Sequence, residues 1–413
     1  MKDQTPQNKA GFVLGACLLF GLSMSVLYVW SVLKFKLTAP IAYGGYEWSS
    51  TQAGLPYVIA IVANAVAMLI GGCIQDRIGP RWVATAGGAL VGLGLIFSGL
   101  VGNSVAGLAI CFGVIVGTGL GFSYSCAIPT ALKWFHSSKK GMISGLIVGA
   151  FGSSAVFYAP LTNALLDSFG IEMALIYLGA GILIVSVSAA QFINNPPSGY
   201  IPATPVKIEQ TTQNVPPADF TWNEMIGTKP FRLIFLIFLL AASVGLMVIG
   251  SMTKIAQTQV GISDTAFLAM LVSFLAITNA LGRVVGGKMS DKIGRINALS
   301  VVLALQMLNM VAFSFYRNLP ILFLGIIIVG FCYGTLLSVI PALCADLYGL
   351  KNFGTNYGIL FLAWGLAGVI APTISDLLYD ATGSFNTTYI ICAIMLGAMV
   401  FVSYLLKKEV ERC

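Results

Sequence analysis

The chain has 413 residues, of which 57 % are hydrophobic and only 9 % are charged, and its mean hydropathy is +0.90. Because an ordinary soluble domain carries about 25 % charged residues, this composition excludes a soluble enzyme, a disordered chain, a collagen and a coiled coil, and it predicts an all-α membrane protein. The net charge of +7 is spread over short loops, which indicates a signal for membrane topology rather than a surface for nucleic acid.

Taken in chain order, the apolar runs predict twelve transmembrane helices, since each span needs about 20 residues. The first six are expected at 12–34, 50–74, 82–101, 105–132, 141–163 and 172–194, and the second six at 231–254, 265–287, 296–315, 320–345, 354–378 and 385–407. The first run is too long for the core of a signal peptide, so we expect it to remain as the first span.

A polar stretch at 195–230 separates the two sets of six spans and contains seven prolines. Such a composition is typical of a flexible linker. The sequence therefore predicts an N-terminal six-helix bundle at 1–194, a cytoplasmic linker at 195–230 and a C-terminal six-helix bundle at 231–413.

The distribution of basic residues predicts the orientation in the membrane. With both termini in the cytoplasm, 17 of the 22 Lys and Arg residues lie in inner loops and tails, and four lie in outer loops. This asymmetry follows the positive-inside rule, so we expect cytoplasmic termini. The compact loops and short tails favour a multi-pass protein of a bacterial inner membrane, and a single pair of bundles favours a monomer.

The two halves of the chain repeat each other. A loop motif around Asp76 recurs around Asp291, 215 residues later, and a Gly-Phe-x-Tyr motif ending at Tyr124 recurs at Tyr333, 209 residues later. Repeats of this kind indicate duplication of a six-helix bundle. They are typical of transporters whose substrate site lies near the middle of the membrane between the two repeats.

The duplicated loop motif carries the charges that we expect to control gating. Asp76 and Asp291 lie at predicted helix ends, where a carboxylate can cap the N-terminus of a helix. Their expected ion-pair partners across the bundles are Arg77 and Lys292. The predicted gating residues are Asp76, Arg77, Arg81, Asp291, Lys292 and Arg295. The alternative is that the motif only determines topology and makes a tight glycine turn.

Arg283 is the strongest candidate for substrate binding. It precedes Asp291 by eight residues, about 12 Å along a helix, and a charge at such depth costs at least about 2.5–3.5 kcal/mol and usually faces a functional cavity. Asn279 shares its helical face. Because the sequence places Asp and Glu residues in loops or near span ends, we expect an anionic substrate as the counter-ion of this planar guanidinium. The alternative is a structural Arg that snorkels to the inner surface.

Aromatic residues lie at depths where they can line a cavity. Tyr124 and Tyr333 occupy equivalent positions in the two repeats, and their hydroxyl groups can donate hydrogen bonds to a carboxylate. Phe361 and Trp364 can limit the volume around its alkyl part. The alternative for each aromatic residue is ordinary packing. The predicted substrate-binding residues are Arg283, Asn279, Tyr124, Tyr333, Tyr28, Phe361, Trp364 and Tyr357.

Catalytic and metal chemistry is not expected. The eight cysteines lie mostly in apolar runs without a CxxC pair, and His136 is the only histidine. The sequence shows no paired carboxylates and no Ser/His arrangement at membrane depth. We therefore expect neither an enzyme nor a bound cofactor or metal.

Several motifs resemble those of a known family. The loops at 72–81 and 287–295 resemble the signature G-x-[LI]-x-D-[RK]-x-G-x-R of the major facilitator superfamily. Trp134-Phe135-x4-Lys140-Gly141, Asn279-x3-Arg283 and Asn356-Tyr357-Gly358 are similar to elements of its oxalate/formate exchanger and monocarboxylate transporter group. The resemblance implies two six-helix bundles, alternating access and binding of a substrate carboxylate by Arg283.

Two departures from that group bear on the substrate. Where its oxalate exchangers carry a Lys in span eleven this chain has Trp364, and where its animal monocarboxylate transporters carry an Asp this chain has Asn279. With one cation in place of two, the resemblance implies a monocarboxylate, because the second charge of oxalate would lack a partner in a dry site. The missing acid makes the substrate carboxyl itself the expected carrier of a proton.

The sequence therefore predicts a secondary active transporter for a small monocarboxylate of the lactate or pyruvate type, working by alternating access as a proton symporter. Two alternatives are open: an oxalate/formate-type anion exchanger, and a carboxylate sensor that binds without transporting. Proton-independent exchange would contradict the predicted coupling, and binding without flux would indicate the sensor. The expected partners are the monocarboxylate anion, protons and the lipid bilayer.

Overall fold

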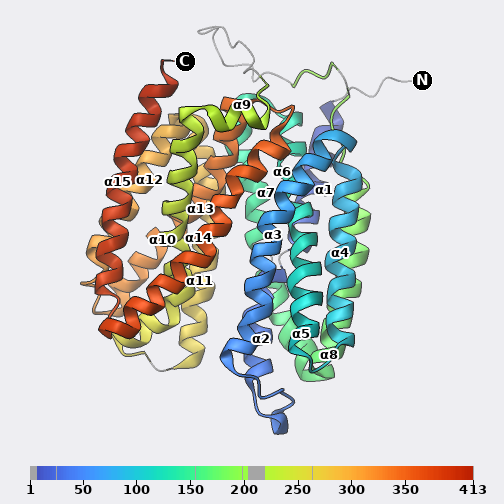
Figure 1. The fold of residues 1–413 in the computed structure, drawn as a ribbon, viewed down its shortest axis with the longest axis vertical. Helices are drawn as coiled ribbons and strands as arrows, with labels where there is room; N and C mark the ends of the chain where they lie inside the picture. Colours follow the sequence, from blue (N-terminus) through green and yellow to red (C-terminus); the bar gives the residue numbers. More distant parts are fainter. Residues whose placement is uncertain are drawn as a thin grey trace. The chain divides into compact units, whose positions relative to one another are not determined.

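The protein is helical throughout the part of the chain that the structure describes. The computed structural model describes residues 7–24, 26–153, 155–197, 199–202, 219–262 and 264–412, and no strand occurs within these ranges. A helix pairs its backbone N–H and C=O groups within one segment, as a chain in hydrocarbon requires. Figure 1 shows these helices coloured along the chain.

Long helices alternate with short connecting ones. In the first half of the sequence they are α1 (Gln7–Ser23), α2 (Trp30–Thr38), α3 (Ser50–Ile78), α4 (Pro80–Leu100), α5 (Val105–Leu108), α6 (Gly117–Trp134), α7 (Lys140–Ser153) and α8 (Ala155–Ala190). In the second half they are α9 (Trp222–Gly227), α10 (Lys229–Val260), α11 (Thr265–Ile293), α12 (Arg295–Phe313), α13 (Leu319–Tyr348), α14 (Phe353–Thr382) and α15 (Asn386–Val410). The 3₁₀ segments are η1 (Val26–Val29), η2 (Ile41–Tyr43) and η4 (Ser137–Lys139), and η3 (Ala109–Val116) is a π-helix between α5 and α6.

Ten helical segments in the described ranges are long and apolar enough to cross a membrane. They correspond to ten of the twelve expected spans. The first expected span, 12–34, is divided into α1, η1 and α2, and the fifth, 141–163, corresponds to α7 and the start of α8, between which Ser154 lies outside the described residues. An apolar run indicates the length of a span but not a break inside it, so the sequence did not predict the division of the first span.

Local hydrogen bonds mark the end of α1. The Ser23 hydroxyl donates to the Phe20 carbonyl at 2.7 Å, and the Met24 amide donates to the Gly21 carbonyl at 3.2 Å. Both bonds span three residues and compete with the four-residue bonds of an α-helix. A second interruption, inside α8, is at Gly170, whose φ of 76° is readily adopted only by glycine; it separates the fifth and sixth expected spans.

The chain forms two compact units. Unit 1 comprises Met1–His136, Ala150–Asp219 and Gly349–Phe361, and unit 2 comprises Ser137–Gly149, Phe220–Tyr348 and Leu362–Cys413. The first turns of α7 therefore belong to unit 2, and the first turns of α14 belong to unit 1. The predicted bundles and linker remain predictions, and the described end of the linker contains the short helix α9.

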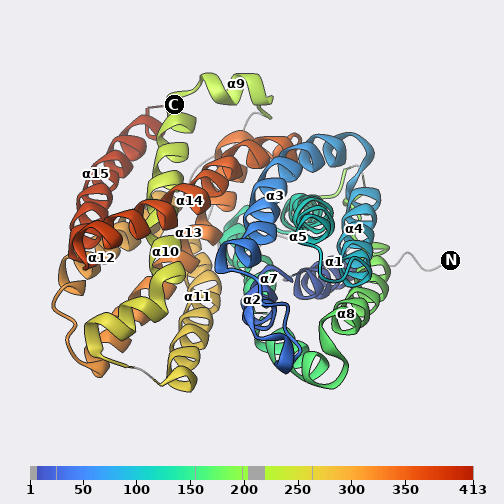
Figure 2. The same cartoon turned by 60° about the horizontal axis from the view of Figure 1, so that its bottom comes forward.

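In unit 1, α1, α3 and α4 pack around the continuous run of α5, η3 and α6 (Figure 2). Glycine allows α3 and α6 to touch through their backbones, because a Cβ on Gly121 would lie 2.6 Å from the Met68 nitrogen. The pair α4 and α8 is similar, since a Cβ on Gly179 would lie 2.6 Å from the Gly92 carbonyl oxygen. Small residues at helix contacts are the usual means of close packing in membranes.

In unit 2, α11 packs along α13, while α10 and α12 pack against both α13 and α15. The α11–α13 contact is close at two consecutive turns of α13. A Cβ on Gly330 would lie 2.9 Å from the Asn279 nitrogen, and one on Gly334 would lie 2.9 Å from the Arg283 nitrogen. The backbone that carries the Asn279–Arg283 pair is therefore held against α13.

Candidate functional site

Arg283 lies in the interior of unit 2. Its side chain projects from α11, and only 2 % of the residue is exposed, while Asn279 one turn earlier is 7 % exposed. The Arg283 Nε donates to the Asn279 Oδ1 at 3.0 Å, as residues four apart on one helical face can. One terminal guanidinium nitrogen donates to the carbonyl of Val148 on α7. These bonds fix the plane of the guanidinium.

The contact between α7 and α11 depends on glycine. A Cβ on Gly145 would lie 2.9 Å from the Arg283 carbonyl carbon, and one on Gly287 would lie 2.8 Å from the Gly141 carbonyl carbon. Real Cβ atoms do not approach backbone so closely, so larger residues would force the helices apart. The Val148 carbonyl reaches Arg283 because these helices touch.

A second polar contact in unit 2 joins two of the predicted aromatic residues. The Trp364 Nε1 of α14 donates to the Tyr333 hydroxyl of α13 at 2.8 Å. The Tyr333 ring packs against α10, since a Cβ on Gly245 would lie 2.7 Å from its Cγ, and Tyr333 is 5 % exposed. Four predicted residues, Asn279, Arg283, Tyr333 and Trp364, therefore occupy neighbouring helices of unit 2.

The other predicted aromatic residues gather in unit 1. The Tyr124 ring of α6 lies 4.3 Å from that of Phe151 and 5.4 Å from that of Phe361, measured between centroids. The Phe361 ring lies 6.0 Å from the Tyr357 ring. Phe151 was not predicted from the sequence. Tyr28 falls in η1, and its side chain lies outside the described part of the structure.

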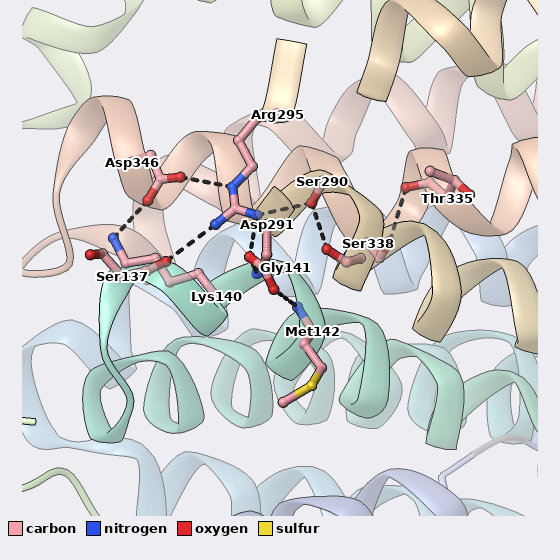
Figure 3. Close-up of polar contacts among 11 residues, drawn as sticks. Ser137, Lys140, Gly141, Met142, Ser290, Asp291, Arg295, Thr335, Ser338 and Asp346 are labelled. Carbon is pink, nitrogen blue, oxygen red and sulfur yellow. Dashed lines mark hydrogen bonds and ion pairs between the residues drawn. The ribbon is translucent and has the colours of Figure 1, made fainter. Parts of the chain in front are cut away.

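A charged cluster in unit 2 holds the first turn of α7 (Figure 3). The Asp291 carboxylate of α11 accepts hydrogen bonds from the backbone amides of Gly141 at 2.9 Å and Met142 at 2.8 Å. These amides belong to the N-terminus of α7, where unpaired N–H groups and the helix dipole favour an anion. The Asp291 side chain is only 9 % exposed, so its charge is largely removed from water.

Three further charged residues complete this cluster. Arg295 forms ion pairs with Asp291 and with Asp346, the latter at 2.9 Å. Lys140 pairs with Asp346 at 2.9 Å and is 7 % exposed at its side chain. The cluster alternates positive and negative groups, as Figure 3 shows. Desolvated charge networks of this kind are costly to break by removal of one member.

The equivalent carboxylate in unit 1 holds the first turn of α14. Asp76 of α3 accepts from the backbone amides of Gly354 at 3.2 Å and Thr355 at 2.8 Å, and from the Thr355 hydroxyl at 2.9 Å. The capping of a helix N-terminus, expected for Asp76 and Asp291, is observed in both cases. In each case the capped helix comes from the opposite half of the sequence.

The ion pairs that Arg77 and Lys292 are expected to form across the bundles stay a prediction. Both side chains are exposed, and neither forms an ion pair within the described part of its own unit. Each directly follows its Asp on a helix, and consecutive side chains point about 100° apart around the axis. The face that presents the carboxylate to the capped helix therefore directs its neighbour away.

The remaining basic residues of the motif behave differently in the two halves. Arg81 donates to the Gln191 Oε1 at 3.0 Å and 2.7 Å, a neutral partner, whereas Arg295 pairs with two carboxylates. Sequence reasoning also missed Lys140 and Asp346 as members of the cluster. Both were visible as charges near span ends, but their spacing along the chain does not indicate that they meet.

The described part of the chain contains no group of three or more His, Cys, Asp or Glu side chains placed to hold a metal ion. The candidate site offers a buried planar cation, an amide, a tyrosine hydroxyl and an indole N–H. Such groups can bind an anion with an apolar body.

Comparison with known proteins gives the family. A family model described as Major Facilitator Superfamily matches residues 11–318 and 304–412. The oxalate:formate antiporter of Oxalobacter formigenes is 25 % identical over 391 residues, covering 94 % of this chain and 88 % of that protein. Monocarboxylate transporter 12 of Rattus norvegicus is 25 % identical over 371 residues, covering 84 % and 75 % respectively. The solved structure of the human organic anion transporter MFSD10 matches with a TM-score of 0.71 at 15 % identity, covering 97 % of this chain and 100 % of that chain.

These comparisons confirm two expectations from the sequence. The motifs resemble the oxalate/formate and monocarboxylate group, and proteins with those names are among the relatives. The all-α fold of the major facilitator type, with twelve expected spans, agrees with the match to the solved transporter structure. The chain is thus a multi-pass membrane protein.

Proposed function

The chain belongs to the major facilitator superfamily, and from that premise we propose that this transporter carries a small monocarboxylate of the lactate or pyruvate type by alternating access, coupled to protons. The names of its relatives include a monocarboxylate transporter and an oxalate:formate antiporter, which supports a small carboxylate as substrate. The runner-up function is exchange of anions such as oxalate and formate.

The observation that carries the proposal is the burial of Arg283. A guanidinium that is 2 % exposed on a helix apolar enough to cross a membrane marks a substrate pathway more often than a packing contact. Its planar donors match the two oxygens of a carboxylate. Asn279 holds the Nε side of the guanidinium at 3.0 Å, which orients those donors before the substrate binds.

The presence of Trp364 favours a substrate with one carboxylate rather than two. It stands where oxalate exchangers of this group carry a Lys, and its indole donates to the Tyr333 hydroxyl at 2.8 Å. An indole adds volume but no positive charge, so a second carboxylate would be desolvated without a cation. We assign the alkyl part of the substrate to aromatic side chains, for which Tyr124, Tyr357 and Phe361 remain candidates.

The two capping carboxylates are proposed to act in gating. Asp291 and Asp76 hold the first turns of α7 and α14, and transport requires such contacts to form and release as the states alternate. Arg295 strengthens the contact at Asp291 through its ion pair. Arg77, Arg81 and Lys292 contribute less, because their side chains lie outside the charged contact.

The placement of the protein in the cell is also a proposal. The excess of Lys and Arg in one set of loops favours cytoplasmic termini by the positive-inside rule. A bacterial inner membrane and a monomeric carrier fit the compact loops. The proton is proposed to enter on the carboxyl group of the substrate.

Uptake into proteoliposomes tests the proposed function. We expect the purified protein to accumulate radiolabelled L-lactate or pyruvate up to about tenfold when the outside is more acidic by about one unit of pH, because one proton per anion couples a tenfold proton gradient to a tenfold substrate gradient. Without the gradient, uptake should only equilibrate. Gradient-independent exchange of oxalate for formate would establish the runner-up, and binding without flux would establish a sensor.

Substitution of Trp364 tests the choice between one carboxylate and two. We expect Trp364→Lys to make oxalate an inhibitor of monocarboxylate uptake at least about tenfold more potent than in the wild type, because the new cation pairs with the second carboxylate. Trp364→Met is the matched control, since it removes the same indole without adding charge. Equal oxalate inhibition of the two variants would contradict this role for Trp364.

A further inference from the structure

The ends of α10 and α15 form an open groove in unit 2. These two helices pack against each other, and the groove has a volume of about 510 Å³. Four basic side chains line it: Lys229 and Arg232 from α10, Lys408 from the last turn of α15, and Arg412 from just beyond the end of α15. The remaining lining consists of the Glu409 carboxylate and the leucines Leu233 and Leu405.

The groove carries an excess of positive charge. Lys229 and Glu409 lie 3.5 Å apart, but the Lys229 side chain is 70 % exposed, so this pair is weak. Arg232, Lys408 and Arg412 form no ion pair with any residue that the structure describes. Cations gathered around one hollow repel one another, and a bound anion relieves that repulsion.

The groove lies at the ends of two helices that are apolar enough to span a membrane, which is the level expected for lipid headgroups. Lys229 begins one apolar span, Lys229–Val260, and Val410 ends another, Asn386–Val410. Trp222 of α9, which precedes α10, is 48 % exposed, and exposed Trp is typical of the boundary between membrane and water. The cations therefore lie where phosphate groups of a bilayer lie.

The same groove continues into an apolar surface. Leu405 is 38 % exposed and Phe401, one turn earlier on α15, is 62 % exposed. On α10, Leu236 is 38 % exposed. Apolar side chains directly below a cluster of cations match a molecule with an anionic head and hydrocarbon chains.

We propose that the groove lined by Lys229, Arg232, Lys408 and Arg412 binds an anionic glycerophospholipid. Its phosphate contacts the four cations, and its acyl chains follow Leu405 and Phe401 along α15. The acyl chains distinguish this ligand from free phosphate, because exposed cations alone hold a small anion weakly in water and burial of hydrocarbon supplies the additional affinity. The site is separate from Arg283 and does not depend on the identity of the transported substrate.

Native mass spectrometry of the purified full-length protein tests the site. Phosphatidylglycerol and phosphatidylcholine with identical acyl chains are added separately, and the bound lipid is counted as mass adducts. We expect the wild type to retain phosphatidylglycerol at least about tenfold better than phosphatidylcholine. The double variant Arg232→Gln/Lys408→Gln should lose that preference, because basic side chains at the headgroup level attract anionic lipid.

A matched control removes two exposed cations elsewhere. Lys9 and Lys351 are exposed and lie outside the groove, so Lys9→Gln/Lys351→Gln should retain phosphatidylglycerol as the wild type does. Equal loss of phosphatidylglycerol from the two double variants would overturn the site, because lipid binding would then depend on the overall charge of the protein and not on this groove. Displacement of the lipid by an equal concentration of inorganic phosphate would overturn the lipid assignment and indicate a simple anion site.

Discussion

We expect Arg283→Lys to lower kcat/KM for monocarboxylate uptake by about thirtyfold or more. Lysine keeps the positive charge but loses the planar set of donors, which includes the Nε bonded to Asn279 at 3.0 Å and the terminal nitrogen bonded to the Val148 carbonyl. Loss of a desolvated, charged hydrogen-bonded contact costs about 2–5 kcal/mol, and each 1.36 kcal/mol of transition-state stabilisation is a factor of ten in rate. Initial rates of uptake into proteoliposomes measure the loss.

Arg317→Lys is the matched control for this substitution. Arg317 is exposed in the turn between α12 and α13, so the same change there should leave uptake within about twofold of the wild type. Folding of each variant is checked by thermal unfolding in detergent. Uptake by folded Arg283→Lys at the wild-type rate would show that the carboxylate binds elsewhere.

The long spans could be predicted from the sequence because their signal is additive. Each apolar run sums to a favourable transfer into hydrocarbon whatever its neighbours are. Helix α10 contains the predicted span 231–254, and α15 contains all but the first residue of the predicted span 385–407. The break between α1 and α2 has no such signal. It coincides with local bonds such as that from Ser23 to Phe20, which an average of hydropathy over twenty residues does not detect.

The candidate site could be predicted where its members share one helix. Asn279 and Arg283 are four residues apart, and the structure joins them as that spacing predicts. Contacts between residues on different helices were harder to predict from the sequence. Lys140 and Asp346 are 206 residues apart, and nothing in their spacing indicates that they meet.

In the loop motif, the role of the carboxylates could be predicted from the sequence, but the residues that they contact could not. These carboxylates were expected at helix ends because a duplicated acid next to a glycine turn is suited to cap a helix. Arg77 and Lys292 were expected to form ion pairs across the bundles, and that expectation stays a prediction. Because each directly follows its Asp, its side chain points away from the capping contact made by that Asp. Arg295, four residues after Asp291, shares its side and forms the ion pair.

The second large effect is expected at Asp291, where Asp291→Ala should reduce uptake to about a tenth or less. The substitution leaves the amides of Gly141 and Met142 without their acceptor and removes one of the two carboxylates that pair with Arg295. Breaking such a buried pair costs about 3–5 kcal/mol, enough to shift an equilibrium between two states far to one side. Uptake assays in proteoliposomes measure the effect.

Labelling of a cysteine placed in α7 distinguishes release of the first turn of α7 from a general loss of folding. Met142 is half-buried in the first turn of α7, so the thiol of Met142→Cys should react faster with a membrane-impermeant maleimide when Asp291→Ala releases that turn. Lys292→Ala is the matched control: this exposed neighbour lies outside the charged contact, so both uptake and labelling should stay near those of the single Met142→Cys variant. If Lys292→Ala impaired uptake as strongly as Asp291→Ala, the gate would depend on the net charge of the loop, and the capping of α7 by Asp291 would not be its mechanism.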